Sequence, residues 1–105
     1  MRKAKKERLE RAGWKVGETK EFLGLTEAEA ALVEVRVSLA RELRRRRLSK
    51  SLSQAALARR IGSSQSRVAR MEAGHPSVSL DLLLRSLFTA GSTRSDIGRV
   101  IAKAS

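Results

Sequence analysis

Cysteine is absent from the 105-residue sequence, and histidine occurs once, at position 75. Without a thiol the chain has no disulfide, no thiolate zinc site and no cysteine nucleophile. A single imidazole excludes a histidine-rich metal cluster and leaves only His75 for histidine acid or base catalysis. We therefore expect no enzyme, no metal and no other cofactor.

Long hydrophobic runs are also missing. No apolar stretch approaches the roughly 20 residues that cross a membrane, and the basic first residues are not followed by the hydrophobic segment of a signal peptide. We expect a cytoplasmic protein without membrane contact.

Hydrophobic residues make up 41% of the chain, and 105 residues are enough for one domain. This composition is that of a globular protein. Strand-like alternation of apolar and polar residues is nearly absent, whereas helical spacing recurs along the chain. The sequence predicts the all-α class.

Basic residues dominate the charge, with 23 Lys and Arg against 11 Asp and Glu and a formal net charge of +12. Residues 41–75 hold ten basic and two acidic side chains, whereas residues 21–40 hold one basic and four acidic ones. The basic middle of the chain predicts an acidic partner.

A long helix should begin at the capping box of Thr26 and Glu29 and run to about Leu48. This helix carries two apolar stripes along its length, and we expect other parts of the protein to cover both. The first consists of Leu32, Val35, Leu39 and Leu43, and the second of Ala30, Val33 and Val37.

Four shorter helices are expected after it, each with a polar cap. The expected limits are residues 54–61 after Ser53 and before Gly62, residues 65–73 after Ser64 and before Gly74, a helix from about residue 80 after Ser79, and a last helix started by Thr93 and Asp96. In the last two, the expected buried residues are Leu80, Leu83, Leu84, Leu87, Phe88, Ile97, Val100 and Ile101.

Residues 53–74, SQAALARRIGSSQSRVARMEAG, place two short helices on either side of a tight turn. Leu57 and Ile61 would face inward from the first helix, and Val68 and Met71 from the second. Such a pair of helices is typical of a helix-turn-helix.

Around these residues the sequence resembles the phage-repressor, or XRE, family. The matching positions are Gln54, Ala58, Gly62, Val68 and Glu72-Ala73-Gly74, and the resemblance covers about residues 40–75. It implies a five-helix repressor-type domain at residues 26–105, here with a long first helix and a short N-terminal extension, a basic arm and leader at residues 1–25.

The resemblance also implies sites on double-stranded DNA. Base readout falls to Gln65, Ser66 and Arg70, because Gln can pair with adenine and Arg with guanine through two hydrogen bonds. The residues expected to hold phosphates or fix the position are Lys50, Ser53, Gln54, Arg59, Ser63, Ser64, Arg67 and His75. A domain that reads so few bases implies a homodimer on a palindromic operator.

Arg47 and Glu72 match the two positions at which the family has an ion pair that ties the long helix to the recognition helix. We assign them to orientation of that helix. Arg46 departs from the family pattern, which has an aliphatic residue there.

The upstream segment resembles the leader of HigA-like antitoxins, a branch of the same family whose members neutralise small RNase toxins. Gly13-Trp14, Val16-Gly17 and Phe22-Leu23-Gly24-Leu25 carry that resemblance. It implies a transcriptional repressor that is also the antitoxin of a type II pair and regulates its own operon. The alternative is a stand-alone XRE-type regulator without a toxin.

Acidic residues in the leader and the first turns of the long helix suit a basic RNase toxin. The candidate contacts are Trp14, Phe22, Leu25, Glu27, Glu29 and Glu34. Trp14 has a second interpretation, in which it covers the stripe of Val33 and Val37. The run of arginines from Arg44 to Arg47 is likewise open between a solvated helix end and a surface that attracts phosphates.

Overall fold

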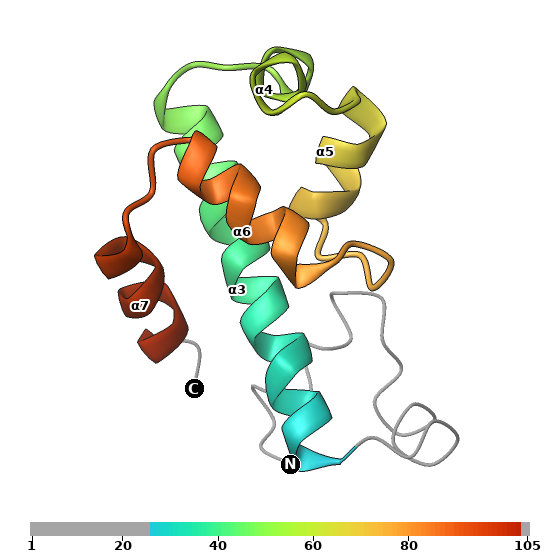
Figure 1. Ribbon diagram of the computed structural model, residues 1–105, viewed down its shortest axis with the longest axis vertical. Helices are drawn as coiled ribbons and strands as arrows, with labels where there is room; N and C mark the ends of the chain where they lie inside the picture. The colour runs from blue at the N-terminus through green and yellow to red at the C-terminus, as the bar shows by residue number, and fades with distance from the viewer. Residues whose placement is uncertain (1–25, 104–105) are drawn as a thin grey trace.

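The computed structural model describes residues 26–103, which contain five helices and no strand (Figure 1). Their bounds are α3 (Glu27–Ser49), α4 (Gln54–Ile61), α5 (Gln65–Glu72), α6 (Leu80–Thr89) and α7 (Arg94–Lys103). The predicted all-α class and the five predicted helices are confirmed. The predicted leader, with Trp14, Phe22 and Leu25, lies outside the described residues.

Polar side chains start every helix where the sequence predicts them. The side-chain oxygens of Thr26, Ser53, Ser64 and Ser79 accept hydrogen bonds from the backbone N–H three residues later, at 3.0–3.2 Å. At α7, Thr93 and Asp96 form a reciprocal capping box of 2.8 and 3.1 Å. Each cap satisfies a backbone donor that the helix itself leaves free.

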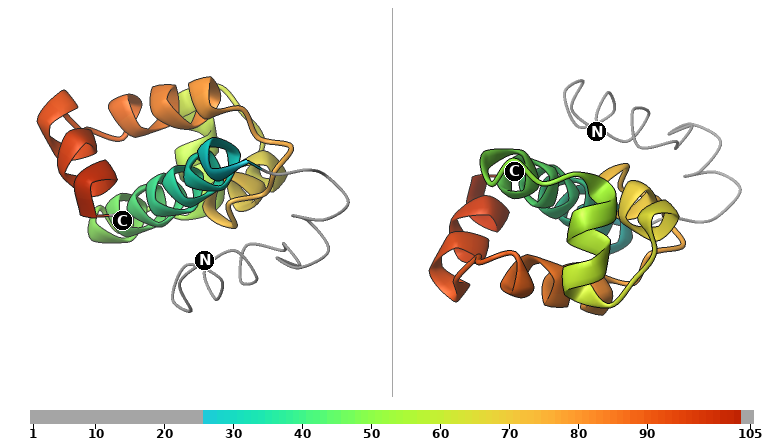
Figure 2. Two further views of the ribbon diagram at one scale, coloured as in Figure 1. Left: turned by 90° about the horizontal axis from the view of Figure 1, so that it is seen from below. Right: turned by 90° about the horizontal axis from the view of Figure 1, so that it is seen from above.

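The long helix α3 is the axis of the fold. It packs against α5, α6 and α7, and α4 packs against α5 and α6. Figures 1 and 2 show α4 and α5 at the C-terminal end of α3 and α7 on the other side. The apolar side chains with no exposed surface are Leu39, Leu43, Leu57, Val68, Met71, Leu83 and Leu87, so the core is enclosed by α3, α4, α5 and α6.

The prediction of burial is wrong for three residues. Leu32, Phe88 and Ile101 are 45%, 47% and 41% exposed. Leu32 precedes the part of α3 that contributes to the main core, and the apolar stripes of α6 and α7 are wider than the face that their neighbours cover. The second stripe, Ala30, Val33 and Val37, is buried as predicted.

Glycines end the two helices of the central motif. Gly62 has a φ of 67° and Gly74 a φ of 69°, in the left-handed region that side chains with a Cβ rarely adopt. Gly74 also lies close to α3, since a Cβ there would be 3.5 Å from Cγ2 of Val37. The turn at Gly62 sets the direction of α5 relative to α4, and Gly74 allows α5 to end against α3.

Candidate nucleic-acid interface

One face of α5 is buried and the opposite face is polar and exposed. Val68 and Met71 have no exposed surface, whereas Gln65, Ser66, Arg67 and Arg70 are exposed. Two small residues, half-buried Ala69 and exposed Ala73, complete the outer side. This is the orientation that the helical spacing predicts, and it leaves the polar edge of α5 accessible.

The arginines on this edge are not engaged elsewhere. Within residues 26–103, the guanidinium groups of Arg67 and Arg70 make no hydrogen bond or ion pair. An exposed guanidinium without a partner can donate up to five hydrogen bonds to an incoming acceptor. The edge of α5 therefore carries cations that are available to a ligand.

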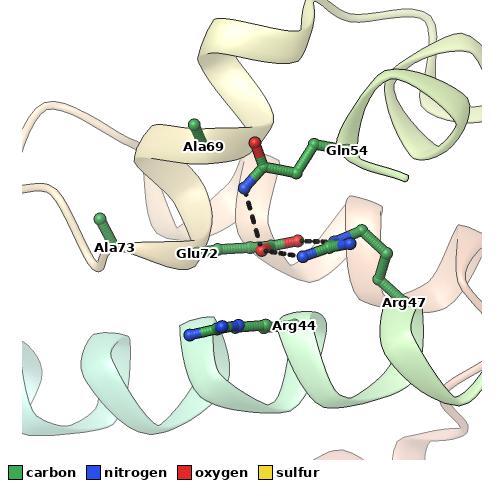
Figure 3. A pocket seen from close by; sticks show the side chains of 6 residues that line it. All are labelled: Arg44, Arg47, Gln54, Ala69, Glu72 and Ala73. Carbon is green, nitrogen blue, oxygen red and sulfur yellow. Dashed lines mark hydrogen bonds and ion pairs between the residues drawn. The ribbon is translucent and has the colours of Figure 1, made fainter. Parts of the chain in front are cut away.

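Arg47 and Glu72 form the predicted ion pair between α3 and α5 (Figure 3). Nε and Nη2 of Arg47 donate to the two carboxylate oxygens at 2.6 and 3.0 Å, and Nη1 donates to the Leu52 carbonyl at 2.8 Å. The side chains are 10% and 4% exposed. The hydrogen bond to Glu72 raises the pKa of Arg47. This two-point contact fixes the C-terminal end of α5 on α3.

Gln54 connects that ion pair to the exposed edge of α5. Its Nε2 donates to Glu72 at 3.3 Å, and its Oε1 accepts from Nε2 of Gln65 at 2.6 Å. From the sequence we expect Gln54 at the DNA backbone and Gln65 at a base, and no local pattern predicts this contact between them. The start of α4 and the start of α5 are thereby linked through side chains.

The predicted positioning residues differ in how accessible they are. Arg59 is exposed, whereas the hydroxyl oxygen of Ser63 is buried, which keeps it from a phosphate. The Lys50 ammonium lies beside Gly91, in the turn after α6. Its nitrogen is 2.9 Å from the position that a Cβ on Gly91 would occupy. His75 is exposed, and its Nδ1 lies 2.7 Å from the hydroxyl oxygen of Ser77 and 3.1 Å from the Ser77 backbone nitrogen.

Arg46 has a role that the family pattern does not foresee. Its guanidinium lies 2.7 Å from Asp96 of α7, 3.3 Å from Glu42 and 3.3 Å from the Gly91 carbonyl. An aliphatic residue would make none of these contacts. The departure from the pattern therefore fastens α7 to α3.

A surface hollow of about 310 Å³ lies between α3, α4 and α5. Figure 3 shows the Arg44 side chain lying along α3 below Glu72 and Ala73, and no dashed line reaches this side chain. We call it the Arg44 hollow. Its lining consists of Arg44, Arg47, Gln54, Ala69, Glu72 and Ala73.

The acidic candidates at the start of α3 separate into two kinds. Glu27 and Glu29 are exposed, whereas Glu34 is buried, with 5% of its surface exposed. Only the first two carboxylates therefore face outward from α3.

Residues 26–103 contain no group of three or more His, Cys, Asp or Glu side chains placed to hold a metal ion. None of the five helices is both long and apolar enough to cross a membrane.

Comparison with known proteins adds one match. Residues 43–85, from the C-terminal half of α3 into α6, match a helix-turn-helix family model. The match includes the ion pair, both helices of the motif and the exposed edge of α5. No curated protein and no solved structure matches the chain. Residues 43–85 are thus similar to XRE-type helix-turn-helix domains, which are found in DNA-binding transcription regulators.

Proposed function

We propose that the protein is a sequence-specific transcriptional repressor whose helix α5 enters the major groove of DNA. The observation that carries this proposal is the exposed polar edge of α5 over a fully buried Val68 and Met71. On that edge Arg67 and Arg70 pair with no residue in the described part of the chain. A helix whose inner face is packed firmly against the core can place the side chains of its outer face against base edges.

In this proposal three side chains read bases, namely Gln65, Ser66 and Arg70. Arg70 is suited to guanine, and the amide of Gln65 to adenine. The residues proposed to hold phosphates or fix the position are Lys50, Ser53, Gln54, Arg59, Ser64, Arg67 and His75. Ser63 is not among them, because its hydroxyl is buried and its backbone N–H donates to the Ala58 carbonyl. Phosphate contacts fix the register of the helix without reading sequence.

The proposal includes a homodimer on a palindromic operator. One α5 contacts only a few base pairs, and two copies related by a two-fold axis read two half-sites about 10 bp apart, or a multiple of that. Light scattering of the free protein and of its DNA complex measures this directly. A single copy on each operator would contradict the dimer.

Protection mapping of the promoter upstream of its own gene tests the repressor. At physiological ionic strength we expect a protected, two-fold symmetric site and preferential binding over random fragments of equal length. Equal affinity for promoter and random DNA would contradict sequence-specific repression, because the electrostatic contribution alone acts on any duplex.

We further propose that the repressor is the antitoxin of a type II toxin–antitoxin pair. The resemblance of the leader to HigA-like antitoxins supports this role. So does the start of α3, where Glu27, Glu29 and the apolar Leu32 are exposed at the end of the helix opposite α4 (Figure 1). Exposed carboxylates near an exposed apolar side chain at one end of a helix suit the surface of a small basic RNase.

Co-expression with the product of a neighbouring small gene tests the antitoxin role. We expect that product to be retained by this protein and its growth inhibition to be relieved. Glu27→Lys with Glu29→Lys should weaken retention, and Asp81→Lys, at an exposed acid on α6, is the matched control. If no neighbouring product is retained or neutralised, the protein is a stand-alone XRE-type regulator.

A further inference from the structure

Arg44 is placed on α3 beside a hollow, and no described residue pairs with its charge. The next three arginines in the sequence all meet carboxylates, Arg45 and Arg46 with Glu42 and Arg47 with Glu72. Within residues 26–103 the guanidinium of Arg44 has no hydrogen bond and no ion pair, and its side chain lines the hollow beneath α5 (Figure 3). Its charge is therefore not neutralised by any residue that the structure describes.

The carboxylate that lines the hollow, Glu72, already has hydrogen-bond partners. Glu72 accepts two hydrogen bonds from Arg47 and one from Gln54. With Glu72 paired to Arg47, the charge that remains in the Arg44 hollow is positive. An anion that enters meets an unpaired guanidinium, and the repulsion from Glu72 is offset by its own partner.

The hollow opens beside the edge of α5 that faces DNA in the proposed function. Ala69 and Ala73, which line it, follow Ser66 at helical spacing, and Gln54 at its other wall is the first residue of α4. The two alanines have no side chain beyond Cβ, so they leave the entrance open. A duplex that receives α5 in its major groove has one phosphate strand running past the start of α4.

We propose that Arg44 binds a phosphate of that strand and that the Arg44 hollow receives the phosphate oxygens. This inference rests on the proposed DNA-binding function and adds a contact made from α3, outside the two helices of the motif. The planar guanidinium suits a phosphate because it can donate two parallel hydrogen bonds.

Arg44→Ala tests the contact in the full chain. We expect affinity for the operator and for random DNA to fall by the same factor, about tenfold, as for loss of one charged hydrogen-bonded contact. The slope of log affinity against log salt should become shallower by about 0.9. Thermal melting should not change, and Arg44→Gln, which keeps most of the side-chain volume, should behave as Arg44→Ala does.

Arg94→Ala is the matched control, because Arg94 is an exposed arginine at the start of α7, away from α4 and α5 (Figure 1). We expect it to bind as the parent protein does. In ethylation interference, one phosphate whose modification weakens the parent protein should no longer matter to Arg44→Ala.

The outcomes separate the two proposals. If the parent protein does not prefer its promoter, the proposed function fails first. If it does, but Arg44→Ala and Arg94→Ala bind with the same affinity and the same salt slope, the Arg44 contact is wrong. A loss restricted to some base sequences would also overturn it, because a phosphate contact carries no sequence information.

Discussion

Arg46 and Arg47 are neighbours in α3, yet they hold different parts of the molecule. Arg47 is buried against Glu72 and holds α5, the helix with the exposed polar edge. Arg46 is half-buried and holds α7 through Asp96, with Glu42 as a second partner. Successive residues of an α-helix point about 100° apart, so adjacent side chains reach different neighbours.

The two ion-pair centres, Arg47 with Glu72 and Arg46 with Glu42 and Asp96, differ in how many arginines pair with each acid. Within residues 26–103, Arg47 is the only cation that forms an ion pair with Glu72, and both side chains are almost completely buried. Glu42 and Asp96 each have a second arginine, Arg45 and Arg99, at the solvent side. The contact that orients α5 is thus the one without a substitute, and the contact that holds α7 is shared.

Arg47→Ala should give the largest effect, because it leaves the Glu72 carboxylate buried without a cation. We expect the free energy of unfolding to fall by about 3 kcal/mol, measured by urea denaturation. The sequence preference of the folded fraction should change little. Arg47→Met with Glu72→Gln removes both charges and should recover part of the loss. Normal stability with lost sequence preference would contradict a structural role for this pair.

Arg70→Ala should affect binding rather than stability. Arg70 is exposed and unpaired within the described residues, so the free energy of unfolding should change by less than about 0.5 kcal/mol. Affinity for the operator should fall by about 1–3 kcal/mol, with relaxed preference at one base position, measured by titration against single-base variants. A uniform loss on all sequences would identify Arg70 as a phosphate contact instead.

Arg46→Ala should destabilise the fold less than Arg47→Ala, by roughly 1 kcal/mol, because the remaining arginines still pair with both acids. Hydrogen exchange locates the effect. The amides of α7 should lose more protection than those of α5, and Arg47→Ala should show the reverse. Equal loss in both helices would mean that the two centres act as one unit.

The smallest expected effect is a dependence of stability on acid pH. A hydrogen bond from Arg45 lowers the pKa of Glu42, and hydrogen bonds from Thr93 lower that of Asp96, with Arg46 adding to both. A lowered folded-state pKa gives stability that is complete above the unfolded value, near pH 4, and is lost as the pH falls through the folded one.

The free energy of unfolding should therefore decline below about pH 4, as measured by urea denaturation at a series of pH values. Glu42→Gln removes one of the titrating groups and should make the decline shallower. An identical decline in the parent protein and this variant would exclude Glu42 as a contributor.

Local signals in the sequence predict the helices well. A Ser or Thr cap acts within three residues and a glycine acts through its own φ, so Ser53, Ser64 and Gly62 can be interpreted without the rest of the fold. Burial is harder to predict. Leu83 and Phe88 belong to one apolar stripe, and which edge of the stripe is covered depends on where α3 lies.

The site could be predicted only in part. The ion pair of Arg47 and Glu72 follows from a family resemblance and not from spacing, and the link between Gln54 and Gln65 was not foreseen. Arg46 and Asp96 are 50 residues apart, and no local pattern joins them. For Arg46 the available signal was Glu42, one helical turn earlier, which indicates an ion pair but not the third partner.

The chain of hydrogen bonds from Glu72 through Gln54 to Gln65 has a direction. A carboxylate accepts and cannot donate, so the amide group of Gln54 turns its nitrogen toward Glu72 and its oxygen toward Gln65. Gln65 must then offer its nitrogen to that oxygen. One N–H and the carbonyl oxygen of Gln65 remain unused, a donor and an acceptor side by side, which is the pair that an adenine edge requires. The buried carboxylate of Glu72 thereby determines which amide atoms of Gln65 are free at the surface.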